Sequence, residues 1–187
     1  MTVLNHVFSC LTAWLAPIMC FTMEEAWLAR NEDEDASVHL RQFPDVPAQW
    51  QDVALAQKWE KIRKVRRVVT GALEIERREK RIGSSLEAAP EIFIVDEALY
   101  DLAAAYDWAE IAITSQATLV AGEGPAEAFR LDDVPGVSVV PKPAKGKKCA
   151  RSWKILPDVG SDSEFPDLTP RDAEAVRQFD ARRMAAE

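Results

Sequence analysis

Apolar side chains recur every two to four positions between residues 48 and 81. These positions are Val53, Leu55, Trp59, Ile62, Val65, Val69 and Leu73. Because most of the steps are three or four residues, the side chains fall on one face of a helix. The pattern predicts one long amphipathic helix over 48–81, which begins after Pro47 and stops before Gly83.

The apolar pattern changes after Gly83. Short runs rich in β-branched residues at 91–95, 111–115, 117–120 and 137–140 predict strands. Between the first two runs, the sequence following Asp96 predicts a helix that this aspartate caps. A further helix is predicted from Pro170 to about Met184. The second half of the chain is therefore expected to contain a small α/β unit followed by a terminal helix.

The N-terminal stretch is apolar on most sides. Residues 2–16 have helical character, Pro17 interrupts them, and residues 7–23 carry no charge. This run is short for a membrane span, contains Ser, Thr and Pro17, and has no basic flank before it. We therefore expect a pair of helices buried in a bundle larger than this chain.

These patterns together predict an α+β protein with three parts. Residues 1–82 are expected to form the C-terminal part of a helical bundle with one long helix. Residues 83–140 are expected to form the small α/β domain, and residues 141–187 a separate C-terminal module.

Charge is segregated along the chain, although the whole sequence of 187 residues has a formal net charge of -8. Ten basic residues and four acids lie between Lys58 and Arg81, and residues 142–154 contain six basic residues and no acid. Two basic surfaces on an acidic body suit a polyanion that is held at chosen places. The alternative for the helix 48–81 is an ordinary solvated face.

Cysteine and histidine usage limits the chemistry. The three cysteines, Cys10, Cys20 and Cys149, show no pairing pattern, which favours a reducing compartment and makes the cytoplasm the expected location. The two histidines lie far apart without a nucleophile signature nearby, and the sequence has no Walker loop, nucleophile elbow or His-Glu-x-x-His. No catalytic centre is predicted in this chain.

The stretch 147–160, KKCARSWKILPDVG, resembles half of a zinc knuckle that has lost a ligand. Cys149 and Ser152 have Cys-x-x-Cys spacing, and Thr169 and Asp172 repeat this spacing downstream. Ser and Thr hydroxyls are poor zinc ligands at neutral pH, so one thiolate and one carboxylate remain. We expect zinc to be lost and no cofactor to be held here. Hydrogen bonds and the packing of Trp153, Ile155 and Leu156 would then replace the metal.

Three stretches of the chain closely resemble, in order, the C-terminal third of bacterial isoleucyl-tRNA synthetases, which are class I enzymes. The stretches are LTAWLAPIMCFTMEEAWL, WEKIRKVRRVVTGALEIERREKRIGSSLEA, and KCARSWKILPDVG followed by FPDLTPRD. The resemblance implies the last helices of an anticodon-binding bundle, a small α/β junction domain and a C-terminal zinc knuckle. Cys149 matches the first family ligand, whereas Ser152, Thr169 and Asp172 stand where cysteines are expected.

The resemblance also implies partners and limits. The parent enzyme would activate isoleucine with ATP and transfer it to tRNA(Ile), but its catalytic and editing domains are not in this chain, so whether the chain is an enzyme stays open. The expected partners are the anticodon arm of tRNA(Ile) and the rest of the synthetase, with no membrane and no DNA. Met1 is expected to be a boundary within a longer chain or a wrongly assigned start.

Candidate RNA-binding residues follow from the resemblance and from charge. An Arg and a Trp of the family's knuckle map onto Arg151 and Trp153, and an unstacked base can lie on an indole face. The alternative for Trp153 is a core residue that fills the space left by the metal. The candidates for phosphate contact are Lys58, Lys61, Lys64, Arg66 and Arg67.

A second hypothesis is a non-enzymatic orphan module that uses the same fold to bind a protein. Phosphate binding weakens steeply with salt, whereas an apolar protein interface does not. Salt dependence therefore separates the two hypotheses.

Overall fold

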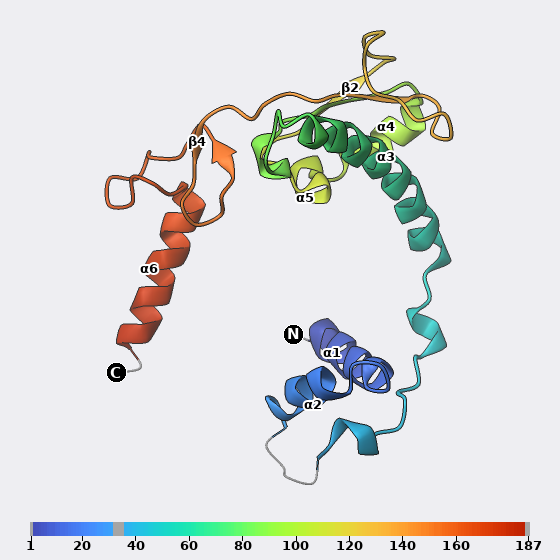
Figure 1. The fold of residues 1–187 in the computed structure, drawn as a ribbon, viewed down its shortest axis with the longest axis vertical. Helices are drawn as coiled ribbons and strands as arrows, with labels where there is room; N and C mark the ends of the chain where they lie inside the picture. Colours follow the sequence, from blue (N-terminus) through green and yellow to red (C-terminus); the bar gives the residue numbers. More distant parts are fainter. Residues whose placement is uncertain (1, 32–35, 186–187) are drawn as a thin grey trace. The chain divides into compact units, whose positions relative to one another are not determined.

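The chain divides into two compact units, Met1–Asp52 and Val53–Glu187. A computed structural model describes residues 2–31 and 36–185 (Figure 1). Each unit has its own packing and is described separately below.

The N-terminal unit is helical. Helix α1 (Thr2–Leu15) and helix α2 (Cys20–Leu28) flank Pro17, as predicted, and short 3-10 turns η1 (Val38–Leu40) and η2 (Ala48–Trp50) follow. The turn between the helices is closed by Leu15, whose carbonyl accepts hydrogen bonds from the N–H groups of Ile18 and Met19. Within the described ranges, no helix is long and apolar enough to cross a membrane.

Polar contacts tie the turns to the two helices. The carboxylate of Glu24 accepts a hydrogen bond from the Val38 N–H at 2.8 Å. The Arg41 guanidinium lies 3.9 Å from the centre of the Trp27 ring and donates to Ser9 of α1. These contacts fix the segment after α2 against both helices.

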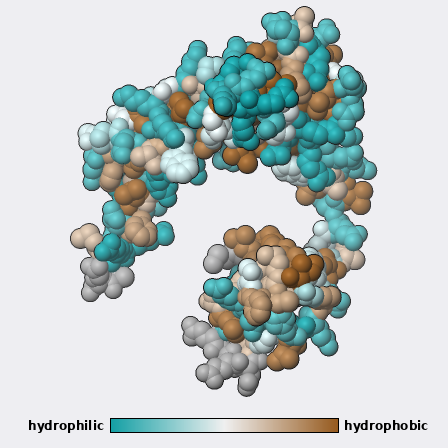
Figure 2. Space-filling view, in the orientation of Figure 1, coloured by the Kyte–Doolittle hydropathy of each residue, from teal (hydrophilic) through white to brown (hydrophobic). Residues whose placement is uncertain are grey.

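An apolar groove of about 660 Å³ runs along α1. Its lining residues are Thr2, Val3, His6, Val7, Cys10, Leu11, Trp14, Val46 and Trp50. Figure 2 shows apolar residues gathered on the visible face of this unit. The expectation of helices that are apolar on most sides is therefore met, but much of this apolar surface is exposed in the unit itself.

Helix α3 (Val53–Arg78) opens the second unit and confirms the long amphipathic helix in a shorter form. It buries Ile62, Val65, Val68, Val69, Ala72 and Leu73. The helix stops before Gly83, as predicted, but both of its predicted bounds were too wide: residues 48–50 form the separate turn η2, and α3 ends at Arg78 and not at residue 81. The chain turns at Lys80, whose φ of 59° is left-handed, while the Arg81 N–H bonds back to the Glu76 carbonyl. This is the hydrogen-bond pattern of a Schellman C-cap.

A three-stranded sheet forms the core of this unit. The strands β1 (Glu91–Ile94), β2 (Thr118–Ala121) and β3 (Val137–Val140) have the order β2-β1-β3, with β1 parallel to β2 and antiparallel to β3. Ile92 lies opposite Val139 and Ile94 opposite Val137, and all four are buried in one cluster with the apolar face of α3. Three of the four predicted strands are thus confirmed.

The crossover from β1 to β2 holds two helices. Helix α4 (Glu97–Ala104) is capped by Asp96, as predicted, and helix α5 (Trp108–Ala112) is capped by Asp107, which accepts from the N–H groups of Ala109 and Glu110. The strand predicted at 111–115 was wrong because this cap starts a helix that includes Ile111 and Ala112. The helix then ends in a left-handed residue, Ile113.

A junction joins the sheet domain to the C-terminal segment. The Ser115 hydroxyl accepts a hydrogen bond from the Ile155 N–H at 2.6 Å and donates to the Leu86 carbonyl. Nearby, the Gln116 amide pairs with the backbone of Lys145 in both directions. One serine therefore connects the turn η3 (Ser85–Glu87), the end of the crossover and the strand β5 (Ile155–Leu156).

The α+β fold with one long helix is confirmed. Because α3 shares its core with the sheet, the compact units divide after Asp52. The three-part division at residues 82 and 140 stays a prediction.

Candidate nucleic-acid interface

Residues 147–184, called here the C-terminal knuckle, combine a short hairpin with a helix. Strand β4 (Lys147–Lys148) pairs antiparallel with β5, and α6 (Pro170–Met184) occupies the predicted span. Cys149, Val159, Leu168 and Ala173 form its small buried core, against which Leu156 packs. The predicted packing role is therefore confirmed for Leu156.

The four positions at metal-ligand spacing converge on one carboxylate. Oδ2 of Asp172 accepts a hydrogen bond from the Cys149 thiol at 3.2 Å and from the Thr169 hydroxyl at 2.9 Å. The Thr169 hydroxyl in turn caps α6 by accepting from the Asp172 N–H at 3.1 Å. Oδ1 of Asp172 pairs with the Arg151 guanidinium at 2.8 Å. We call Cys149, Arg151, Thr169 and Asp172 the Asp172 cluster.

The carboxyl group of Asp172 has a strongly lowered pKa. Burial raises the pKa, but the polar neighbours outweigh this effect and lower it from 3.8 to about 2. The carboxylate is therefore charged at neutral pH, and Arg151 supplies the compensating positive charge.

Ser152, the last of the four positions, takes part through its backbone. Its N–H donates a hydrogen bond to the Cys149 sulfur at 3.5 Å. Its hydroxyl lies near enough to Asp172 to favour the charged carboxylate, yet the buried oxygen has no hydrogen-bond partner among the described residues.

These residues do not fit a zinc ion. They offer one thiol, one carboxylate and two hydroxyls, whereas structural zinc takes four Cys or His ligands. The carboxylate is already bound by a guanidinium, whose positive charge repels a cation. Nowhere in residues 2–31 and 36–185 do three or more His, Cys, Asp or Glu side chains gather in a way that could hold a metal ion.

Trp153 lies in the tight turn between β4 and β5 and is exposed. The residue is 63% exposed to solvent, so the alternative in which Trp153 fills the core was wrong. Its φ of 63° is left-handed, which costs an L residue about 1–2 kcal/mol, and the turn is closed by its N–H bonding to the Cys149 carbonyl at 3.0 Å. A strained backbone that presents an exposed indole is a common feature of binding sites.

One lysine lies at the exposed indole. The Lys148 ammonium is 5.6 Å from the centre of the Trp153 ring, whereas Lys147, also exposed, precedes it on the same strand. Sequence reasoning singled out the basic run 142–154 but not these individual residues. The run itself was the signal, and only the hairpin shows which lysines accompany Trp153.

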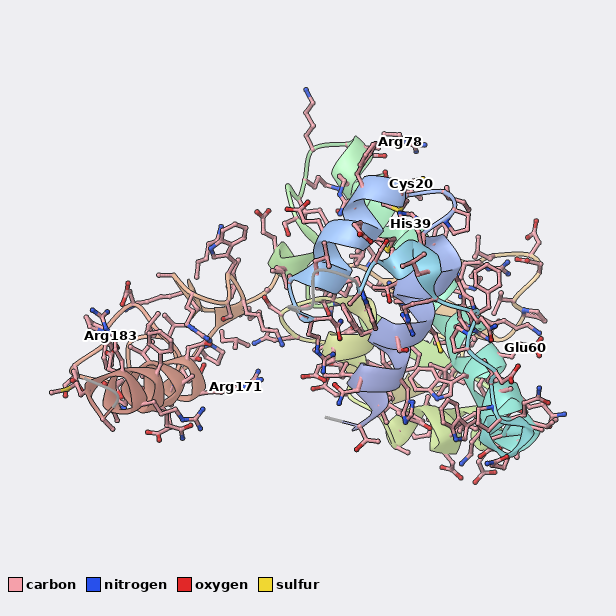
Figure 3. All side chains as sticks on the ribbon, turned by 90° about the horizontal axis from the view of Figure 1, so that it is seen from below. Cys20, His39, Glu60, Arg78, Arg171 and Arg183 are labelled. Carbon is pink, nitrogen blue, oxygen red and sulfur yellow. The ribbon has the colours of Figure 1, made fainter. Side chains whose placement is uncertain are left out.

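The basic residues of α3 divide into two groups. Lys58 and Lys61 are exposed, and neither forms an ion pair within the described part of the chain. By contrast, Lys64 pairs with Glu60, which Figure 3 labels, and Arg67 pairs with Asp133. These partners compete with phosphate for the two cations.

Arg66 is used within the fold. Its Nε donates to the Ile111 carbonyl at 2.7 Å, which attaches α3 to the last turn of α5, and its side chain is half-buried. Of the five candidates on α3, Lys58 and Lys61 are the freest to contact an RNA backbone. The role of all five in RNA binding stays a prediction.

Comparison with known proteins gives the class first. Residues 1–92 match the family model described as the anticodon-binding domain of tRNA ligase. The first half of the chain therefore belongs to this class of tRNA-binding domains.

The particular relatives are isoleucine–tRNA ligases. The chain is 58% identical over 181 residues to that of Agrobacterium fabrum, 55% over 177 residues to that of Brucella abortus and 54% over 177 residues to that of Bartonella henselae. The matches cover 97%, 95% and 95% of this chain but 19%, 18% and 18% of the relatives. The chain is thus homologous to the isoleucine–tRNA ligases over nearly its whole length, and it spans about a fifth of theirs.

Proposed function

We propose that this chain binds the anticodon arm of tRNA(Ile) as the C-terminal part of an isoleucine–tRNA ligase. The ligase would attach isoleucine to this tRNA with ATP in the cytoplasm, through catalytic and editing domains outside the chain. Its partners would be the tRNA and the rest of the ligase, with no membrane or DNA involved. The observation that carries the proposal is the 58% identity over 97% of the chain.

The geometry supports a division of labour within the second unit. Trp153 would stack on an unpaired base of the anticodon loop, because an exposed indole can accept any base on its face. Lys148 beside it, the exposed Lys147 on the same strand, and Lys58 and Lys61 on α3 would contact phosphates and set the affinity without reading sequence. Arg151 would supply a planar guanidinium for a phosphate or base edge.

The test is a binding titration of the chain against a tRNA(Ile) transcript and an anticodon-swapped transcript, at two salt concentrations. The proposal predicts binding that weakens steeply with salt and falls when the anticodon is exchanged. Equal affinity for the two transcripts would show that the chain binds RNA without recognising the anticodon. No binding to either transcript at low salt would contradict an autonomous anticodon module.

One observation favours the alternative of a non-enzymatic module that binds a protein. The apolar groove along α1, about 660 Å³ in volume, offers a surface typical of protein contacts. Such binding would change little with salt, so the same titration distinguishes the two candidates.

A further inference from the structure

The Asp172 cluster joins two pieces of chain that are separate in sequence. The hairpin turn after β4 contributes the Cys149 thiol and the Arg151 guanidinium, and the start of α6 contributes the Thr169 hydroxyl together with Asp172 itself. All three donate to the same buried carboxylate. A structural zinc ion performs this cross-linking task in small domains, where four side chains converge on one centre.

The electrostatics of this centre are inverted relative to a metal site. A zinc knuckle has a cation at the centre and negative thiolates around it, whereas here an anion is at the centre and proton donors surround it. Hydrogen bonds to a charged acceptor are stronger than neutral ones, and burial keeps water from competing with them. Asp172 has only 8% of its side chain exposed.

The inverted centre also reaches the exposed residues of the turn. Asp172 bonds to Cys149 and Arg151, which lie in the turn, and the Cys149 carbonyl and N–H bond to the backbone of Trp153 and Lys154, respectively. The left-handed conformation at Trp153 persists only where such surrounding contacts determine it.

We propose that Asp172 takes the place of the metal ion in the C-terminal knuckle and acts as a positioning residue that holds Arg151 and the Trp153 turn in place. The knuckle then folds without metal, and its order depends on one carboxylate. An effect of Asp172 on tRNA affinity, without contact to the tRNA, rests on the proposed function. The metal-free folding of the knuckle around Asp172 does not depend on that function.

The experiment measures hydrogen exchange by mass spectrometry in peptides covering residues 147–173 of the full chain, with the sheet residues 91–140 as internal reference. Metal content is measured on the same samples, with and without a strong zinc chelator. Asp172→Asn keeps the size of the side chain and removes its charge. Asp167→Asn is the matched control, because Asp167 is an exposed aspartate of the same module.

The expected result is a chain without stoichiometric zinc whose exchange does not change with chelator. In Asp172→Asn, peptides in 147–173 should exchange at least about tenfold faster, because a buried network has lost its charged acceptor. Residues 91–140 and the Asp167→Asn control should exchange like the wild type. One bound zinc per chain with chelator-sensitive exchange, or an Asp172→Asn variant that exchanges like the wild type, would overturn the proposal.

A second variant tests the centre by restoring a metal frame. Ser152→Cys, Thr169→Cys and Asp172→Cys combined give two Cys-x-x-Cys pairs with Cys149. The proposal predicts one zinc per chain and exchange that becomes sensitive to chelator in 147–173. A triple variant as insensitive to metal and chelator as the wild type would show that these four positions do not surround a common centre.

Titration of tRNA(Ile) with the same variants separates this inference from the proposed function. Weaker binding by Asp172→Asn but not by Asp167→Asn supports positioning through Arg151 and Trp153. A wild-type chain that does not bind tRNA would remove the proposed function, whereas the exchange result would still decide whether Asp172 replaces the metal.

Discussion

The Arg151 guanidinium lies 2.8 Å from Oδ1 of Asp172, in an ion pair whose arginine is 55% exposed and whose aspartate is 8% exposed. One partner faces solvent and the other is in the core of the knuckle. Arg151 is thus available to a ligand and also needed by the fold, so its substitution should change both binding and stability.

Arg151→Ala should weaken tRNA binding and also destabilise the knuckle. The buried carboxylate loses one of its donors, but the arginine is half-exposed and water replaces part of its effect, so we expect a loss of about 1 kcal/mol. Urea unfolding gives the stability, and a tRNA titration gives the affinity. Arg171→Ala is the control, because Arg171 is exposed at the start of α6 (Figure 3). Equal effects of the two substitutions would contradict the special role of Arg151.

Trp153→Ala should separate binding from stability. Loss of a base-stacking indole is expected to weaken RNA binding by about 1–3 kcal/mol. The exposed side chain supports little of the core, so the free energy of unfolding should change by less than about 0.5 kcal/mol. Trp153→Gly should be more stable than Trp153→Ala by about 1 kcal/mol, because glycine adopts the left-handed φ of 63° without strain.

Phe179→Ala is the control for Trp153, since Phe179 is a similarly exposed aromatic residue on α6. Its removal should leave tRNA affinity unchanged. If both aromatic residues contributed equally to binding, stacking on the hairpin turn would not be the source of affinity.

Lys61→Gln and Lys64→Gln should differ in salt dependence, although both residues are exposed on α3. Lys61 has no ion-pair partner in the described residues, whereas Lys64 already pairs with Glu60 at 3.0 Å. Removing a phosphate contact lowers the slope of log K against log salt by about 1. We expect this change for Lys61→Gln and a smaller one for Lys64→Gln. Identical slopes for both variants and the wild type would exclude this part of α3 from the interface.

Stability should depend on pH through Asp172. The pKa of its carboxyl is about 2 in the folded chain and 3.8 as an ordinary value, so the unfolded state takes up the proton first as pH falls. The contribution of Asp172 is therefore complete well above pH 4 and is lost between about pH 4 and pH 2. It amounts to about 2 kcal/mol.

Urea unfolding of the wild type and Asp172→Asn at a series of pH values measures this contribution. The difference between the two should be constant from pH 7 to 5 and shrink as pH approaches 2. Comparison with this variant removes the effects of other carboxylates with lowered pKa, such as Asp162 beside Arg177. A difference that does not change with pH would contradict the prediction.

Gly146→Ala should disrupt the hairpin of the knuckle. Its φ of 130° is adopted almost only by glycine, and an added Cβ would lie 2.2 Å from the backbone of Leu156. Because backbone atoms cannot move aside as a side chain can, we expect a loss of at least about 2 kcal/mol in urea unfolding. Gly122→Ala has a similar φ but no atom near the added Cβ, so it measures strain alone. A Gly146 effect no larger than the Gly122 effect would show that the contact is not limiting.

Periodicity predicted the elements whose side chains meet a single core. Helix α3, strand β3 and helix α6 lie close to where their sequence patterns place them, because the burial of one face of an element is decided locally. Helix α4 likewise begins at its predicted Asp96 cap. Residues 111–115 were mistaken for a strand because a run of β-branched residues suggests one. The helix cap at Asp107 lies before this run, and the left-handed conformation of Ile113 cannot be inferred from it.

The candidate site was predictable as a set of positions but not as a centre. Ligand spacing predicted that Cys149, Ser152, Thr169 and Asp172 belong to one site. In the structure, two of them, Cys149 and Thr169, donate hydrogen bonds to the carboxylate of the third, Asp172. That Asp172 would be the acceptor and Arg151 its partner depends on side-chain directions that spacing does not contain. For the same reason, the sequence could not show that Arg66 is held by Ile111 while Lys61 is free.

Within the second unit, Ser115 fixes the position of the hairpin relative to the sheet domain. Its hydroxyl is bonded on one side to the Leu86 carbonyl of the sheet domain and on the other to the Ile155 N–H of the hairpin, two residues after Trp153. This one hydroxyl holds the hairpin on the sheet domain. Under the proposed function, the residues that contact RNA in these two parts would therefore keep a fixed separation, which the RNA would have to match.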